Sequence, residues 1–169
     1  MASARHLRWL LLLLFAVACS QPAAGQATAL IISGDVQKPL SLSLDDLRHE
    51  AHTTVKATNE HQDNHEQVYG GVLLSALLKK AGAPTGPQLR GAAMATYVVA
   101  EGADGYRVTF SIAELDSDFQ DSEVIVADTL NGAPLDQKVG PLRLVVPHDK
   151  RPARWVRTLR SIRVVEVPK

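Results

Sequence analysis

The chain has very little cysteine: Cys19 is the only one among its 169 residues. One thiol cannot form an intramolecular disulfide. Because it stands so close to the N-terminus, it also gives the rest of the chain neither a cysteine nucleophile nor a cysteine-based metal site. A fold built from the remaining residues must therefore be stable through packing alone.

The motifs of several large enzyme classes are missing as well. The sequence has no G-x-S-x-G nucleophile elbow, no P-loop and no glycine-rich dinucleotide motif. Its formal net charge is zero and aromatic residues make up 5% of it, with none interleaving a basic stripe. We therefore expect no nucleic acid as a partner. Beyond the N-terminal segment no run is apolar enough to span a bilayer.

The first 27 residues have the pattern of a secretory signal peptide. Cationic residues precede the apolar run WLLLLLFAVA, which is too short to cross a membrane, and small residues follow it. We therefore expect an exported protein, either periplasmic or anchored at the envelope. Residues 28–169 have the length of one domain.

Processing of this signal has two outcomes that the sequence leaves open. The run AVAC places small residues directly before Cys19, as in a lipoprotein signal, and acylation there would be the only route to a membrane. The alternative is ordinary cleavage after Ala18 or near Ala27.

Short strands dominate the rest of the sequence, and this predicts an α+β fold with mixed, strand-rich sheets. Helices are expected at 44–50, at 71–81 and at 111–116. The first has Ser43 as its N-cap, and the last has Ser111 and Glu114 as a capping box. Expected strands are 27–34, 53–61, 65–69, 92–102, 105–110, 122–130, 141–146 and 161–167.

The polar stretch between two of these strands contains a group of potential metal ligands. By spacing, His61 and His65 could share a helix face, but Asp63 and Asn64 are typical of a turn. A solvated hairpin tip and a metal site are both left open, the tip being the simpler interpretation.

Charge is distributed unevenly along the chain. Residues 138–169 carry nine Lys or Arg and two acids, whereas residues 19–137 carry seven and sixteen. The basic tail could simply neutralise the acidic body, or it could form an anion site. The segment PHDKRPARW, residues 147–155, concentrates the cations between two prolines, and a stiff basic loop ending on a tryptophan suits an oxyanion. Beyond it, Arg157, Arg160 and Arg163 are expected on a solvated face.

Three motifs in a fixed order carry a family resemblance. The runs YGGVLLSALLKKAG, ADGYRVTFSIAELD and GPLRLVVPHDKRPARWVRTLRSIRVVEV resemble the molybdopterin-binding domain of the sulfite oxidase family, in its small, stand-alone bacterial form. The similarity spans about residues 29–167. It implies the α+β fold of that domain, a molybdopterin cofactor and an oxidoreductase-like ancestry.

The resemblance also implies a set of cofactor-binding residues. In family members that hold the cofactor, the segment after the V-P pair contributes basic residues and a Lys-Trp or Arg-Trp pair to the pocket. By position these are His148, Lys150, Arg151, Arg154 and Trp155, and the pterin phosphate would be the bound anion.

The sequence departs from the family pattern in two respects. Active members ligate molybdenum through a cysteine near the end of an early strand, and the corresponding stretch here, VKATNEHQDNHEQ, contains none. Exported members usually carry a twin-arginine signal, whereas this chain has RHLR; a general secretory route carries an unfolded chain, which holds no cofactor.

Three functions remain open from the sequence, and no catalytic residue or metal ligand is assigned. The favoured hypothesis is a degenerate, non-catalytic binding module whose basic loop holds a small anionic ligand or contacts a partner protein. The second is a molybdopterin-dependent oxidoreductase with non-cysteine ligation, approached by Glu60 or His61. The third is a structural accessory domain of the envelope that holds no cofactor.

Overall fold

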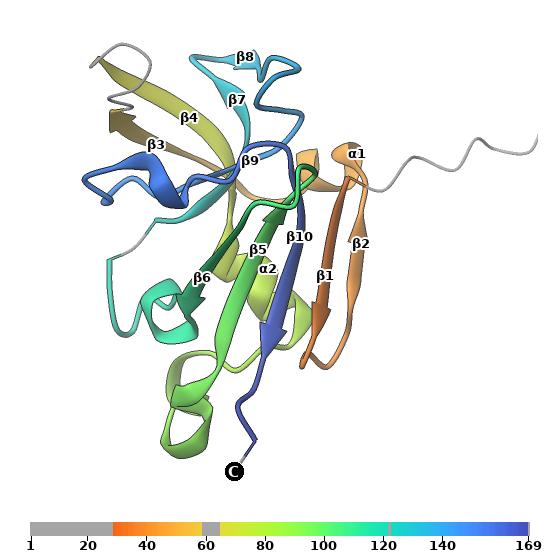
Figure 1. Ribbon diagram of the computed structural model, residues 1–169, viewed down its shortest axis with the longest axis vertical. Helices are drawn as coiled ribbons and strands as arrows, with labels where there is room; N and C mark the ends of the chain where they lie inside the picture. Colours follow the sequence, from red (N-terminus) through yellow and green to blue (C-terminus); the bar gives the residue numbers. More distant parts are fainter. Residues whose placement is uncertain (1–28, 59–64, 122, 169) are drawn as a thin grey trace, which may run out of the picture.

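The computed structural model describes residues 29–58, 65–121 and 123–168, in which ten strands form two sheets (Figure 1). This confirms the α+β, strand-rich class predicted from the sequence. The strands are β1 Leu30–Gly34, β2 Leu40–Leu42, β3 His52–Thr58, β4 Glu66–Leu73, β5 Tyr97–Gly102, β6 Arg107–Ser111, β7 Ile125–Leu130, β8 Ala133–Pro134, β9 Arg143–Val145 and β10 Leu159–Val165.

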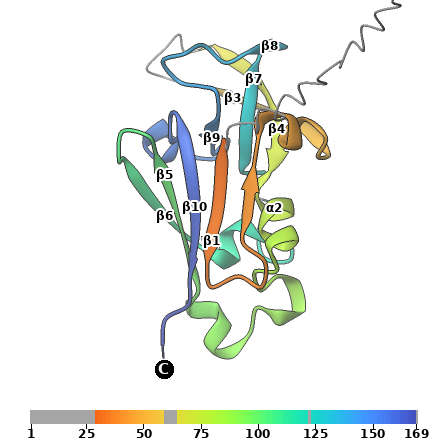
Figure 2. The ribbon, with the colours of Figure 1, turned by 90° about the vertical axis from the view of Figure 1, so that its right-hand side faces the viewer.

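The first sheet has the order β2-β1-β10-β5-β6, with β1 and β10 parallel and the other pairs antiparallel. Buried and exposed side chains alternate along its strands, as expected for a sheet with one face against the core and one face in solvent. Ile32, Val98 and Ile162 are fully buried, while Ile31 and Arg163 on neighbouring positions are exposed. Helix α2, Leu74–Ala81, lies on the buried side of this sheet (Figure 2).

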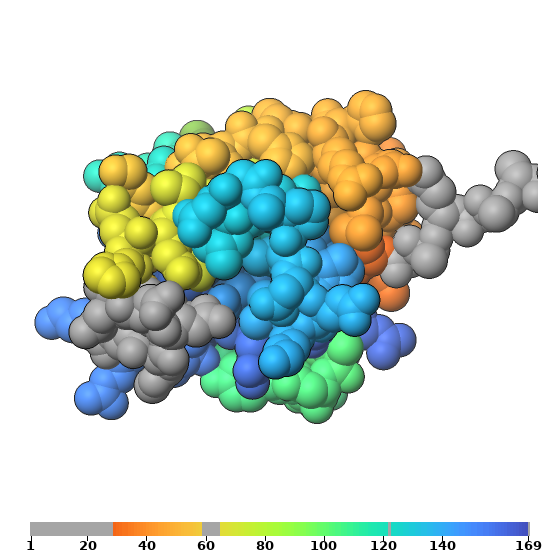
Figure 3. Space-filling view, turned by 90° about the horizontal axis from the view of Figure 1, so that it is seen from above, coloured from red at the N-terminus to blue at the C-terminus, as the bar shows by residue number. Residues whose placement is uncertain are grey.

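The second sheet runs β3-β4-β7, and both β8 and β9 pair with β7 along its other edge. The β7–β8 hairpin turns at Asn131 and Gly132, with φ of 50° and 80°. Positive φ at both positions is what a two-residue hairpin requires, and Asn-Gly is the residue pair that most readily adopts it. In Figure 3 this hairpin and the segment after it lie at the centre of one end of the molecule, beside β4.

Helix α2 is shorter than the sequence predicted. Residues 71–73 belong to β4, because Gly71 and Val72 pair with both β3 and β7 and Leu73 pairs with β7. The helix ends as expected at Gly82, in the left-handed conformation with φ of 74°. Its buried residues are Leu74, Leu77, Leu78 and Ala81. Ala76 and Lys80 are exposed, so they lie on the opposite, solvated side of the helix.

The two predicted helix caps have opposite outcomes. Helix α1, Leu44–Arg48, begins at Ser43, whose hydroxyl accepts from the Asp46 amide at 3.1 Å, as expected. The predicted helix at 111–116 is a short 3₁₀ helix, η3, Ile112–Leu115, and Ser111 makes no capping bond to it. The capping box was wrong because Glu114 accepts from Arg154 instead.

Three further 3₁₀ helices lie within the connecting segments: η1 Gly86–Gln88, η2 Gly91–Ala95 and η4 Pro152–Arg154. Because η2 occupies the first half of the strand predicted at 92–102, that strand begins only at Tyr97. The strand predicted at 161–167 ends at Val165, and Val167 beyond it is 50% exposed. Arg157, Arg160 and Arg163 are exposed, as expected.

Two predicted features lie outside the described residues: the signal segment 1–27, and residues 59–64, most of the polar hairpin tip. The two arms of that hairpin are present as β3 and β4. Among the helices that the structure describes, none is long and apolar enough to cross a membrane.

A histidine clasp joins the start of β3 to β7. His52 Nε2 lies 3.2 Å from Asp128 Oδ2, and His52 Nδ1 lies 3.1 Å from the Glu50 carbonyl. Burial lowers the pKa of His52, but the Glu50 carbonyl and the Asp128 carboxylate outweigh it and leave that pKa raised. With an acceptor at each ring nitrogen, the imidazolium form donates twice.

We expect this clasp to stabilise the fold at low pH. Because the folded pKa of His52 is raised, its contribution is complete below the ordinary value of 6.5 and is lost as pH rises through the raised value. The effect should stay below about 1 kcal/mol, since the pair is partly solvated. Urea unfolding at pH 6 and pH 9 should show this pH-dependent difference between wild type and His52→Gln. A matched His65→Gln change at an exposed histidine should show none; equal pH profiles for wild type and His52→Gln would contradict the clasp.

Candidate functional site

The basic loop, residues 147–155, connects β9 to β10 and contains η4. Its side chains fall into two groups. His148, Lys150 and Arg151 are exposed or nearly so, and within the described part of the chain none of them has a hydrogen-bonding or ionic partner. The loop therefore presents three unengaged basic groups to solvent, and the anion-binding role predicted for them stays a prediction.

Arg154 is bound by acids. Its Nε and Nη2 donate to Asp149 at 2.9 and 2.6 Å, and its Nη1 donates to Glu114 Oε1 at 2.9 Å. Its guanidinium carbon lies 4.7 Å from the centre of the Phe110 ring. The bonds to Asp149, with the charges of both acids, raise the pKa of Arg154. A ligand anion would have to compete with two carboxylates, so the role predicted for Arg154 stays a prediction.

A cavity of about 380 Å³ lies beside this ion pair, and its chemistry does not favour an anion. Glu114, Asp121 and Asp149 contribute carboxylates to its lining, against only Arg154 and His148 as basic groups. Lys150 and Arg151 are not part of that lining. Any anion held by the loop would therefore bind on another side of it.

Trp155 is buried and fixed. Its indole Nε1 donates to the Val146 carbonyl at 2.9 Å, so the ring is tied back to the end of β9. Tyr69, from β4, meets it edge-on with ring centres 5.4 Å apart. The two rings join the second sheet to the loop before β10.

Arg143 completes this aromatic pair, and the sequence analysis did not single it out. It is the first residue of β9 and is only 5% exposed. Its guanidinium carbon lies 5.0 Å from the centre of the Trp155 ring and 5.9 Å from that of Tyr69. Its Nε is buried without a hydrogen-bond partner, and no described acid forms an ion pair with it. Burial lowers the pKa of this guanidinium.

A buried, unpaired guanidinium is costly. The penalty for taking an ion out of water amounts to several kcal/mol, and cation–π contacts of about 1–2 kcal/mol each offset only part of it. Arg143 therefore has unused capacity for an anionic partner. One signal in the sequence could have revealed it: an arginine inside the apolar run PLRLVVP, whose neighbours Leu142 and Leu144 are both fully buried.

The cofactor implied by the family resemblance fits this site only in part. Arg143 can donate to a phosphate group, because the residue is only 5% exposed and its Nε is buried without a hydrogen-bond partner. The metal does not fit, since the chain has no cysteine after Cys19 and no group of three His, Cys, Asp or Glu in the described residues could hold one. Among the described residues, the donor set therefore fits an organic phosphate better than a cysteine-ligated metal.

Comparisons with known proteins agree with the fold and with the resemblance. The family model described as the oxidoreductase molybdopterin binding domain matches residues 20–169. No curated protein matches the chain. The chain is similar to the crystal structure of the sulfane dehydrogenase SoxCD from Paracoccus pantotrophus, with 27% identity and a TM-score of 0.66.

That alignment covers 87% of this chain but only 40% of the SoxCD chain, so this protein spans less than half the length of its structural relative. The family match extends over nearly all of the sequence, including both sheets and the basic loop. The chain therefore belongs to the family of oxidoreductase molybdopterin-binding domains, with the fold found in the sulfite oxidase family.

Proposed function

We propose that this protein is an exported, non-catalytic binding module that holds a small phosphate-bearing ligand, with pterin phosphate as the ligand that the family suggests. One observation carries the proposal: Arg143 is buried against Trp155 and Tyr69, its Nε has no hydrogen-bond partner, and no described acid lies within ion-pair distance of it. Proteins rarely bury an unpaired charge unless another group compensates for it.

The basic loop supports the same ligand chemistry. Lys150 and Arg151 are exposed cations on the segment that contains Trp155, and Trp155 in turn contacts Arg143. In this proposal Arg143 is the desolvated anchor, and the loop cations raise the local concentration of anions. Arg154 holds the loop in shape through Asp149 and Glu114 and need not touch the ligand.

The missing thiolate supports the non-catalytic part of this proposal. A soft thiolate suits the metals of this family, and no such ligand is present after Cys19. In this proposal the chain's own residues bind and orient the organic ligand, and no group of metal ligands is found among the described residues. Export and acylation of Cys19 belong to the same proposal: they would place the module at the envelope.

The non-catalytic part of the proposal is tested by metal content. The protein purified from the organism that produces it should contain far less than one molybdenum atom per chain when measured by inductively coupled plasma mass spectrometry. A matched preparation of a cysteine-ligated family member, analysed in parallel, shows that molybdenum survives purification. About one molybdenum per chain would overturn the proposal and favour an oxidoreductase with non-cysteine ligation.

A further inference from the structure

Three buried side-chain atoms in the described part of the chain lack a hydrogen-bond partner: Thr96 Oγ1, Asp128 Oδ1 and Arg143 Nε. Thr96 is neutral, and Asp128 is bonded through its other oxygen to His52. Arg143 differs from both, because its charge is permanent and its guanidinium has no hydrogen bond to any described residue. It is therefore the buried group with the strongest need for a counter-ion.

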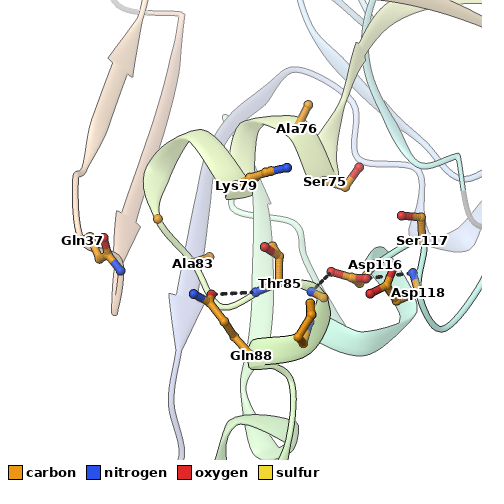
Figure 4. A pocket seen from close by; sticks show the side chains of 13 residues that line it. Gln37, Ser75, Ala76, Lys79, Ala83, Thr85, Gln88, Asp116, Ser117 and Asp118 are labelled. Atoms are coloured by element: carbon orange, nitrogen blue, oxygen red, sulfur yellow. Dashed lines mark hydrogen bonds between the residues drawn. The ribbon is translucent and has the colours of Figure 1, made fainter.

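A cavity of about 750 Å³ beside α2 has no such unpartnered group in its described lining. Its buried acid is Asp116, which is only 7% exposed. Asp116 accepts from the Gly86 amide at 2.7 Å and from the Asp118 amide at 2.9 Å, as the dashed lines in Figure 4 show. The protein itself satisfies that carboxylate, so the volume of this cavity points to no ligand, whereas the unpartnered Arg143 does.

Arg157 lies beside Arg143, on the segment that leads into β10. The Leu144 amide, directly after Arg143, donates to the carbonyl of Val156, directly before Arg157, at 2.9 Å. The backbones that carry the two arginines therefore run side by side. Val156 is fully buried, whereas Arg157 is exposed, so the pair consists of one buried and one solvated arginine.

The side chain of Arg157 is free, and its charge acts on Arg143. Within the described residues Arg157 has no side-chain hydrogen bond and no ion pair. Burial is the main cause that lowers the pKa of the Arg143 guanidinium, and the charge of Arg157 lowers that pKa further. Two neighbouring cations that lack acidic partners repel each other unless an anion lies between them. The pair therefore has the charge arrangement of an anion site.

One acid also acts on Arg143. Asp136 tends to raise the pKa of Arg143, but less strongly than Arg157 lowers it, and it forms no ion pair with either described arginine. Its Oδ1 accepts from the Lys138 amide at 2.7 Å and from the Val139 amide at 3.3 Å, so this carboxylate is part of the turn before β9. Asp136 therefore reduces the repulsion between the two arginines without neutralising them.

We propose that Arg157 is the second cation of the anion site and that the two arginines select a doubly charged phosphate monoester over a singly charged phosphodiester. This inference rests on the phosphate-binding function proposed above and adds to it the charge of the ligand. Arg143 donates from the buried side, next to the Trp155 ring, and Arg157 donates from the solvent side. A monoester offers three terminal oxygens and about two negative charges above pH 7, which is enough for two guanidinium groups.

Isothermal titration calorimetry at pH 8 tests this selection with two probes, a pterin monophosphate and the same compound carrying one O-methyl group on the phosphate. The wild type should bind the monophosphate about tenfold more tightly than the methyl diester. Arg157→Gln should reduce that preference to about twofold, because one exposed charge pair is worth about fivefold in affinity. A merely steric effect of the methyl group would persist in this variant.

Two further variants separate charge from shape. Arg157→Lys keeps the cation and should keep most of the preference for the monophosphate. Asp136→Asn keeps the Oδ1 acceptor of the turn but removes the opposing charge, so it should strengthen monophosphate binding by about twofold. Arg163→Gln is the matched control, because Arg163 is equally exposed but lies on the outer face of β10, and it should leave the preference unchanged.

Arg143→Met distinguishes failure of this inference from failure of the phosphate site itself. It should weaken the binding of both probes. If it does so while the wild type binds the two probes equally, or while Arg157→Gln keeps the full preference, the role of Arg157 is overturned and the phosphate anchor stands. An equal loss of preference in Arg163→Gln and Arg157→Gln would also overturn it, as general charge attraction. If the wild type binds neither probe, the proposed function fails and this inference fails with it.

Discussion

Trp155→Ala should lower the free energy of unfolding by about 3–5 kcal/mol, the cost of removing a large buried aromatic side chain. Trp155 is 4% exposed, meets Tyr69 edge-on and carries the guanidinium of Arg143 on its face. Its loss leaves a cavity and removes two favourable ring contacts. For a domain of this size the midpoint of thermal unfolding should fall by roughly 10 °C.

Trp155→Phe serves as the matched control. Phenylalanine keeps an aromatic ring for Tyr69 and Arg143 but loses the bond from the indole nitrogen to the Val146 carbonyl. It should therefore cost less, about 1–2 kcal/mol, because one neutral hydrogen bond and a small volume are lost. Circular dichroism during urea unfolding measures both variants. A cost below about 1 kcal/mol for Trp155→Ala would show that the ring is not central to packing.

Arg143→Met should have the opposite effect on stability. Methionine fills a similar volume and avoids the desolvation of an unpaired guanidinium, while the cation–π contacts with Trp155 and Tyr69 are lost. Replacing buried charge by apolar groups is often neutral or stabilising by about 1–4 kcal/mol. We therefore expect the free energy of unfolding to stay unchanged or to rise by up to about 2 kcal/mol.

That outcome would mark Arg143 as a residue retained for binding, since function often carries such a stability cost. Arg163→Met is the matched control, because Arg163 is exposed on the outer face of β10 and should change stability by less than about 0.5 kcal/mol. A loss of 3 kcal/mol or more for Arg143→Met would instead mean that the guanidinium is structural.

Most of the fold was predictable because local chemistry determines it. The Asn131–Gly132 turn, the Gly82 helix end and the Ser43 cap each depend on one or two neighbouring residues. The start of α2 was not predictable in this way. Residues 71–73 read as helix by apolar content, but pairing of β4 with strands on both sides holds them extended.

In the candidate site, too, local features were predictable from the sequence and contacts between distant residues were not. Its basic loop could be found from composition, because cations cluster between Pro147 and Trp155 in an otherwise neutral chain. The pairing of Arg154 with Glu114 could not be predicted from composition, since those residues are 40 positions apart. The burial of Arg143 could not be predicted either. A charged residue in an alternating strand is expected on the solvated face, but every residue of β9 is buried.

Arg143 as the anchor of a phosphate group is the central feature of the proposed function. Isothermal titration calorimetry with a pterin monophosphate, compared with the same pterin lacking phosphate, tests this directly. We predict that the wild type prefers the phosphate form and that Arg143→Met weakens its binding by about tenfold to a hundredfold, the worth of a charge-assisted hydrogen bond. Equal affinities of the wild type and Arg143→Met for the pterin monophosphate, or no preference of the wild type for the phosphate form, would contradict the account.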